Sequence, residues 1–242
     1  MSRSHRDPGV GMGGTHADSR RSPFDGTFWA MLAPLERELV LQAGAVRRFE
    51  PGESLGRQGD SSQHVYVLLV GSIEIVTDVS TGYEGVLAVR GSGDVVGELA
   101  AVDGRPRSAT MRALERVEAI VVPSERFAAL CRSRPELSWV LLHVVVGRLR
   151  ELSRQRADDG GRPVAQRLAV LLIELAGRYG VAVGETVMIA IPITQKSMAG
   201  LISASRESVV RALAELRRQR LIATARRRVT ILRLDALEEL AS

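Results

Sequence analysis

The sequence predicts an α+β fold in which two units are joined by one long helix. Three observations support this prediction. Short strand-like segments with glycine-containing turns fill residues 46–122, an apolar helical stretch covers 135–156, and two short helices followed by two short strands occupy 193–232. Short strands with turns at near-regular spacing are typical of a β-barrel or jelly roll, which we therefore expect for the first unit.

The N-terminal segment differs from the rest of the chain. Residues 1–25 are rich in Gly, Ser, Arg, Asp and His and have no hydrophobic periodicity, so we expect a disordered extension. No apolar run follows the N-terminal arginines, and the longest apolar run, 139–147, is too short to cross a bilayer. The sequence therefore predicts a cytoplasmic protein without a membrane segment.

The first unit begins with a pair of short helices over 28–41, broken at Pro34. Short strands then end at turns such as Pro51-Gly52 and Gly59-Asp60. These strands are expected at 46–49, 54–57, 64–70, 73–78, 84–90, 108–114 and 119–122. A short helix is expected to follow at 124–131.

The long helix over 135–156 carries an apolar stripe that needs a partner surface, either the first unit or a second copy of the chain. The stripe consists of Leu137, Leu141, Val144, Val145, Leu149 and Leu152. Residues 158–161 then predict a hinge, and Pro163 begins the next helix, 164–179.

The segment 193–216 predicts two short helices joined by a tight turn. Thr194 and Ser205 are suitable N-caps, since each hydroxyl can accept a backbone N–H. The second helix presents Arg206, Glu207 and Arg211 near its start; Glu207 is one position away from a capping box, so its carboxylate is expected to point outward. Two guanidiniums and a carboxylate there can read base edges in a DNA major groove. The alternative is a surface helix with solvated charges.

Charge supports a polyanionic partner. The chain has a net charge of +5, and the segment 195–233 contains ten basic residues against two glutamates. A basic unit of this kind binds nucleic acid through counterion release, unless the charges only aid solubility. Residues 221–232 predict a wing of two short strands around three arginines, of which Arg227 is expected to contact a phosphate.

The sequence shows no catalytic or metal-binding pattern. One cysteine, Cys131, excludes a disulfide framework and a cysteine-ligated iron–sulfur cluster. The four histidines are scattered, and His143 lies in an apolar helical run, where a packed residue is more common than a haem ligand. We find no paired acids and no nucleophile–base pair, so we expect binding rather than catalysis.

The segment 97–110, GELAAVDGRPRSAT, closely matches the phosphate-binding cassette of cyclic-nucleotide-binding domains at Gly97, Glu98, Arg107 and Ser108. With the helix sequence SRESVVR, the chain resembles the catabolite-activator (CRP/FNR) family of bacterial transcription regulators over about residues 28–234. The resemblance implies an N-terminal cyclic-nucleotide-binding β-roll (a double-stranded β-helix or jelly roll), a long dimerisation helix and a C-terminal winged helix-turn-helix.

The cassette also has a physical rationale. Arg107 can meet the charge of a cyclic phosphodiester, Glu98 can accept from the ribose 2′-OH, and Gly97 allows close backbone approach. The alternative is a structural ion pair between Glu98 and Arg107. The expected nucleotide-binding residues are Gly97, Glu98, Leu99, Ala100, Arg107, Ser108, Leu152 and Ser153. Leu152 replaces the threonine that contacts adenine in the cyclic-AMP-responsive members of the family, although cyclic AMP (cAMP) remains the favoured allosteric ligand.

The resemblance divides the chain into an extension (1–25), a nucleotide-binding domain (26–134), a dimerisation helix (135–157), a hinge (158–161) and a DNA-binding domain (162–242). It implies a homodimer on a palindromic operator with TGTGA-like half-sites, and RNA polymerase as a partner if the protein is an activator. The expected DNA contacts are Thr194, Gln195, Lys196, Ser205, Arg206, Glu207, Arg211 and Arg227. The family's usual turn glycine is Ser203 here, a substitution that costs on the order of 1 kcal/mol.

Three alternatives remain open. A regulator of this family could bind DNA constitutively or respond to another ligand. In a different class, the chain could be a cyclic-nucleotide-binding regulatory subunit, which the basic C-terminal unit argues against. No resident cofactor and no metal are expected.

Overall fold

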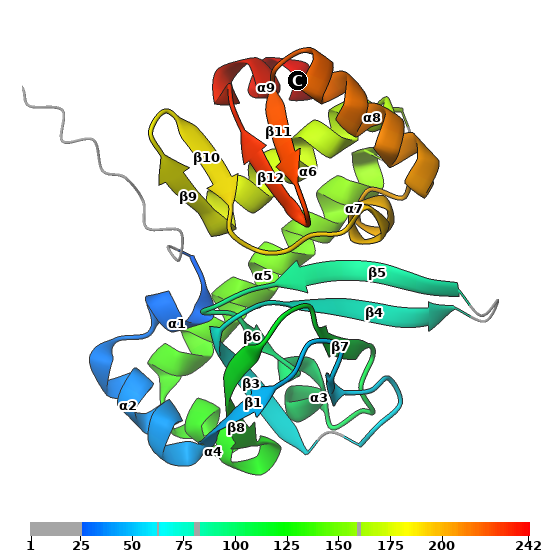
Figure 1. The fold of residues 1–242 in the computed structure, drawn as a ribbon. Coiled ribbons are helices and arrows are strands. Elements are labelled where there is room, and N and C mark those ends of the chain that lie inside the picture. Colours follow the sequence, from blue (N-terminus) through cyan, green and yellow to red (C-terminus); the bar gives the residue numbers. More distant parts are fainter. Residues whose placement is uncertain (1–25, 62, 80–82, 159–160) are drawn as a thin grey trace, which may run out of the picture.

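The computed structural model describes residues 26–61, 63–79, 83–158 and 161–242. Figure 1 shows two units, one above the other, with the long helix α5 running between them. The predicted extension 1–25 and residues 159–160 of the predicted hinge lie outside the described residues.

The first unit is a roll of two antiparallel sheets. One has the strand order β1 (Ala45–Phe49), β8 (Val117–Pro123), β3 (His64–Val70) and β6 (Val95–Val96). The other has the order β2 (Ser54–Gly56), β7 (Thr110–Ala113), β4 (Ile73–Val79) and β5 (Tyr83–Arg90). Four helices accompany them: α1 (Phe28–Met31), α2 (Pro34–Ala43), α3 (Glu98–Asp103) and α4 (Ser124–Ser133).

Two apolar layers hold the roll together. Between the sheets lie Phe49, Tyr66, Leu68, Ile73 and Met111. On the opposite face of the β3–β8 sheet, Phe28 and Phe127 pack beneath the helices, with their ring centroids 6.3 Å apart. The alternation of inward and outward side chains along each strand produces these two layers.

In helix α5 (Pro135–Asp158), the predicted apolar stripe does not face a single partner surface. Leu137, Leu141 and Val144 are buried against the roll of the same chain, so they are not available to a second copy. The apolar residues that α5 leaves exposed lie on another face and include Trp139 (70% exposed), Leu142 (51%) and Leu149 (62%). The stripe therefore divides between two faces of the helix.

The second unit combines four helices with a four-stranded sheet. Its helices are α6 (Val164–Tyr179), α7 (Gln195–Leu201), α8 (Arg206–Arg218) and the terminal α9 (Leu234–Ala241), which packs on α6. The sheet has the order β11 (Ile222–Ala225), β12 (Arg228–Ile231), β10 (Thr186–Ile189) and β9 (Gly180–Val183). The hairpin β9–β10 and helix α9 are elements that the sequence analysis did not predict.

The predicted turn chemistry is confirmed. Thr194 accepts the backbone N–H of Ser197 at 3.0 Å, and Ser205 accepts that of Ser208 at 3.2 Å, so both act as N-caps. Ser203, between α7 and α8, has a φ of +49°, the left-handed conformation expected at this turn. Strands β11 and β12 form the expected wing, and Arg227 at its turn has a φ of +58°.

The two units share a packed surface. Val76, Val86 and Val89 of the roll belong to the same apolar cluster as the core of the second unit. Helix α7 lies on β5, where a Cβ atom on Gly200 would come within 3.0 Å of the backbone nitrogen of Val86, so the close approach requires glycine. Figure 1 shows α7 directly above the β4–β5 hairpin.

Candidate functional site: a charged cavity and a basic helix-turn-helix

A cavity of about 360 Å³ opens between the roll and α5. Its lining comes from β4, β5, the α3 segment, β7 and one face of α5. The charged residues around it are Arg90, Glu98, Arg107, Arg148 and Glu151, so three guanidiniums face two carboxylates and leave one positive charge. A volume of this size is in the range of small-ligand pockets.

Gly97 and Arg107 shape one end of this cavity. Gly97 has a φ of +78° and precedes α3, and a side chain there would collide with the Arg107 guanidinium. Arg107 is buried and donates to the carbonyl oxygens of Gly97 (3.2 Å) and His64. Since a guanidinium has five N–H donors, these two carbonyl oxygens do not use all the donors of Arg107.

The aromatic groups beside Arg107 respond to its charge. The guanidinium lies 5.5 Å from the ring centroid of Tyr66, a cation–π contact. Burial raises the pKa of Tyr66, whereas burial and then the charges of Arg107 and Arg47 lower the pKa of His64. His64 therefore adds little positive charge to the cavity at neutral pH.

Glu98 pairs with an arginine that the sequence analysis missed. Its Oε1 atom accepts from Arg148 at 2.7 Å, and Arg148 also donates to the carbonyl oxygen of Val95 at 2.6 Å. The side chain of Glu98 is 5% exposed and the Nε of Arg148 is buried without a partner. The ion pair of Glu98 is thus made with Arg148 and not with Arg107, as the alternative in the sequence analysis had it. Arg148 lies one helical turn before Leu152, a spacing that could have indicated it.

The cavity brings together seven of the eight residues expected to bind nucleotide: Gly97, Glu98, Leu99, Ala100, Arg107, Ser108 and Leu152. The exception is Ser153, which is not part of the lining; its hydroxyl donates to the carbonyl oxygen of Leu149 at 2.9 Å. Ser153 is exposed in this chain, so its expected contact with the nucleotide stays a prediction.

Apolar side chains line the opposite end. An irregularity in the β4–β5 pairing, next to Ile75, places Leu87 and Ala88 together beside the cavity. On the other side, α5 contributes Leu149 and Leu152, which are 62% and 49% exposed. The cavity thus has a charged end at the cassette and a largely apolar end, with a partly open rim.

The exposed start of α8 carries the side chains expected to read DNA. Arg206, Glu207 and Arg211 are all exposed, and Arg211 donates to the Ser208 hydroxyl at 2.9 Å. Hydrogen bonds from its own backbone N–H and from Ser205 lower the pKa of Glu207. Its carboxylate is exposed, as expected, and remains ionised at neutral pH.

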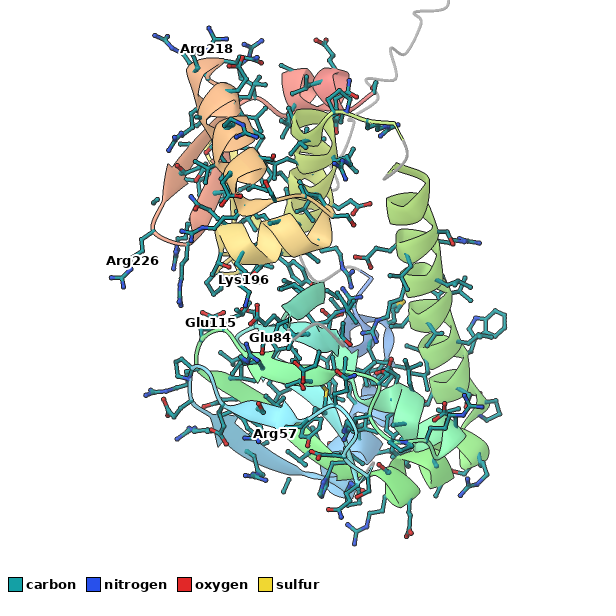
Figure 2. All side chains as sticks on the ribbon, turned by 90° about the vertical axis from the view of Figure 1, so that its right-hand side faces the viewer. Arg57, Glu84, Glu115, Lys196, Arg218 and Arg226 are labelled. Atoms are coloured by element: carbon teal, nitrogen blue, oxygen red, sulfur yellow. The ribbon has the colours of Figure 1, made fainter. Side chains whose placement is uncertain are left out.

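A hollow of about 570 Å³ lies between α8, α7 and the wing. Its polar lining includes Thr194, Gln195, Lys196, Arg206, Arg217 and the three wing arginines Arg226, Arg227 and Arg228. The backbone N–H of Ile193 donates to the carbonyl oxygen of Arg227 at 3.0 Å, which ties the wing to the start of α7. Figure 2 shows Arg226 projecting from the wing tip. Five of the eight expected DNA contacts thus line one basic hollow, namely Thr194, Gln195, Lys196, Arg206 and Arg227; Ser205, Glu207 and Arg211 are not part of its lining.

Polar contacts also connect the units. Lys196 at the start of α7 pairs with Glu84 of β5 at 3.2 Å, and the two face each other in Figure 2. Hydrogen bonds from Arg112 and Lys196 lower the pKa of Glu84 to about 2. Behind them, the fully buried Asp94 accepts from Tyr179 (2.7 Å) and Arg178 (3.2 Å) of α6. Burial alone would raise the pKa of Asp94, but the charges of Arg178, Arg90 and Arg148 hold it below the usual value.

In the described part of the chain, no cluster of three or more His, Cys, Asp or Glu side chains is arranged to hold a metal ion. Among these residues, no helix combines the length and the apolarity that a membrane span requires.

Comparison with known proteins identifies both units. Residues 46–134 match the cyclic nucleotide-binding domain family, and residues 166–240 match the Crp-like helix-turn-helix domain family. The chain is 31% identical over 167 residues to the CRP-like cAMP-activated global transcriptional regulator of Mycobacterium tuberculosis, across 69% of this chain and 75% of that protein. It belongs to the CRP/FNR family of transcription regulators, which bind DNA through a helix-turn-helix domain.

The chain is also similar to proteins with other descriptions. The chain is 26% identical over 196 residues to the global nitrogen regulator of Synechococcus elongatus, covering 80% of this chain and 88% of the relative. The structure of FixK2 from Bradyrhizobium japonicum shares the fold, with a TM-score of 0.73 at 20% identity over 82% of this chain and 98% of that one.

Proposed function

We propose that the chain acts as a homodimeric transcription regulator whose affinity for a palindromic operator is controlled by a cyclic nucleotide, with cAMP as the first candidate. The observation that carries this proposal is the convergence of Glu98, Arg107 and Arg148 on one cavity with a single net positive charge. A cyclic phosphodiester with one negative charge matches that balance. It acts by binding and not by catalysis, in the cytoplasm, and an activator would also contact RNA polymerase.

The cavity accounts for both ends of such a ligand. The phosphate is held by Arg107, with Ser108 at the rim, and the ribose 2′-OH donates to Glu98. The M. tuberculosis relative is described as cAMP-activated, which favours adenine as the base. The nitrogen-regulator relative supports the alternative of another ligand, and constitutive DNA binding remains the second alternative.

Dimerisation through α5 follows from its exposed apolar face. Trp139, Leu142 and Leu149 recur at intervals of three and seven residues, the spacing of a coiled-coil seam. A second α5 would cover this seam and part of the open cavity rim. Trp139→Glu is expected to convert a dimer to a monomer in analytical ultracentrifugation; a dimer of unchanged strength would exclude this seam.

DNA recognition is assigned to α8, with phosphate contacts from its flanks. Arg206, Glu207 and Arg211 read a TGTGA-like half-site, and two copies read a two-fold symmetric operator. The phosphates are contacted by Thr194, Gln195, Lys196, Ser205 and Arg227. A regulatory subunit without DNA would leave this basic surface unused.

The ligand is tested by calorimetry with cAMP and cyclic GMP on the full chain. Arg107→Ala leaves the phosphate without its charged partner in a partly buried site, so it should cost several kcal/mol and abolish measurable binding. Arg105→Ala, an exposed arginine in the same loop, is the matched control. Absence of binding by the unmodified protein, with the same operator affinity with and without nucleotide, would refute control by a cyclic nucleotide.

The DNA assignment is tested by titrating operator and random duplexes at several salt concentrations. Arg206→Ala should cost ~1–3 kcal/mol on the operator and relax specificity at a guanine. Arg227→Ala should weaken both duplexes alike and reduce the salt slope by about one. Arg218→Ala, at the far end of α8 where Arg218 pairs with Glu215, is the control (Figure 2). Equal losses on both duplexes for Arg206→Ala and Arg227→Ala would refute the recognition-helix assignment.

A further inference from the structure

The apolar end of the cavity contains one charged pair, Arg90 and Glu151. Arg90 is the last residue of β5, is 7% exposed and donates to the carbonyl oxygen of Val89 at 2.9 Å. Its second terminal nitrogen lies 3.5 Å from Oε2 of Glu151 on α5. Both side chains line the same cavity as Glu98 and Arg107.

This pair is separate from the group proposed to bind phosphate and ribose. Glu151 is three residues beyond Arg148 on α5, which places it ~4.5 Å further along the helix axis. It is adjacent to Leu152, on the part of α5 where the base is expected. The other lining residues at this end are the apolar Ile75, Leu87, Leu149 and Leu152.

Glu151 has an oxygen available for a ligand. Its ion pairs with Arg90 (3.5 Å) and with Arg178 of α6 (3.3 Å) are both made through Oε2. The Oε1 atom therefore remains as an acceptor on a side chain that lines the cavity. Arg90 correspondingly supplies N–H donors beside it.

Resting on the cyclic-nucleotide function proposed above, we propose that Arg90 and Glu151 read the base: Glu151 accepts a hydrogen bond from the 6-amino group of adenine, and Arg90 donates one to an adjacent ring nitrogen. An acceptor beside a donor complements that edge of adenine. Guanine presents an oxygen where adenine has its amino group, and that oxygen would face the Glu151 carboxylate. The pair thus takes the role of the hydroxyl that Leu152 cannot supply.

The position of the pair also connects the base to the DNA-binding unit. Oε2 of Glu151 accepts from both Arg90 and Arg178, and Arg178 also pairs with the buried Asp94. A base that forms a hydrogen bond with Glu151 therefore alters the contact between Glu151 and Arg178 of α6. A ligand that lacks the 6-amino group should bind the cassette without making this change.

The test compares ligands on the unmodified full chain by calorimetry. The probes are cAMP, N6,N6-dimethyl-cAMP, which lacks both amino hydrogens, and purine riboside 3′,5′-cyclic monophosphate, which lacks the amino group. We expect cAMP to bind at least about tenfold more tightly than either analogue, because a buried acceptor without its donor is costly. This series requires no variant to fold. Binding of cAMP without discrimination overturns the inference, whereas no binding of any nucleotide overturns the proposed function itself.

Variants then test which residues cause the preference for cAMP over the analogues. Glu151→Ala should reduce the preference for cAMP to within about threefold, and Arg90→Met should weaken cAMP and the purine analogue together, since both keep the ring nitrogen. Arg178→Ala removes the other partner of Glu151 and should keep the preference. Arg150→Ala, an exposed neighbour on α5, is the control. A full preference retained by Glu151→Ala would overturn the assignment.

Discussion

Tyr179→Phe tests whether the two units are held together by the buried carboxylate of Asp94. The Tyr179 hydroxyl donates to Oδ2 of Asp94 at 2.7 Å, and the two residues are 4% and 1% exposed. Phenylalanine keeps the ring that packs against Gly91 and removes only this donor. A hydrogen bond to a charged group contributes about 1.5–3 kcal/mol, so the substitution should lower the thermal midpoint by roughly 3–10 °C.

Two spectroscopic probes can show which unit loses stability. Trp29 and Trp139, the only tryptophans in the chain, lie in the first unit and on α5, so their fluorescence reports the roll. Circular dichroism at 222 nm also reports the helices of the second unit. Since the lost bond joins the units, Tyr179→Phe should separate the two transitions on heating.

Tyr66→Phe is a matched control, because the Tyr66 hydroxyl donates to the neutral carbonyl oxygen of Leu55 within the roll. It should cost only about 0.5–1.5 kcal/mol and leave the transitions coincident. If Tyr179→Phe costs no more than Tyr66→Phe and its transitions also coincide, Asp94 does not hold the units together.

Three further outcomes are expected. Asp94→Asn should remove the stabilisation by the ionised carboxylate, which is present above the ordinary aspartate pKa of about 4 and is lost as the pH falls through the lower pKa of the folded state. The difference in unfolding free energy between the variant and the unmodified protein should therefore shrink in acid. A constant difference in urea melts from pH 7 to 3 would contradict this. Leu152→Thr should tighten cAMP binding by roughly 1 kcal/mol in calorimetry by adding a hydroxyl at the cavity, and unchanged affinity would place the base elsewhere. Gly200→Ala favours an isolated helix by about 0.5–1 kcal/mol, but its Cβ would lie 2.9 Å from that of Val86. This clash should push α7 off β5 and reduce the effect of cAMP on operator affinity, and an unchanged effect would show that the α7–β5 contact does not transmit it.

Local patterns predicted most elements of the fold. Strand 64–70 and helix 164–179 were placed with the observed bounds, because period-two and period-3.6 alternation and turn residues are local signals. The short helix α3 was not predicted, because its six residues between Gly97 and Gly104 are too few to show a helical periodicity. The hairpin β9–β10 and helix α9 were not predicted.

The faces of α5 were harder to predict, because the helix is apolar on more than one side. Leu137 and Leu141 face the roll, whereas Trp139 and Leu142 face outward. Periodicity identifies a helix but does not say which of two apolar faces its own chain covers. That depends on where α1 and α4 pack, which is a property of the tertiary structure.

The same limit applies to the cavity. The cassette could be recognised because Gly97, Glu98 and Arg107 lie within eleven residues and keep a fixed spacing. Arg148 is fifty residues from Glu98, and Glu151 is sixty-one residues from Arg90, so no local pattern connects the members of these pairs. Burial also made them hard to find, since charged residues are usually solvated and pair inside a protein only where the fold brings them together.

Strand β5 gives the cavity and the DNA-binding unit a common wall. Leu87 and Arg90 line the cavity, while Val86 and Val89 pack in the core of the second unit. A ligand changes an equilibrium only between states that it binds unequally. A ligand can displace β5, which contacts α7, or form a hydrogen bond with Glu151, which contacts α6. In either case it acts directly on residues that contact the DNA-binding unit. Coupling between the cavity and α8 therefore needs no long path through the molecule: it requires only that the packing of β5 against α7 differ between the bound and free states.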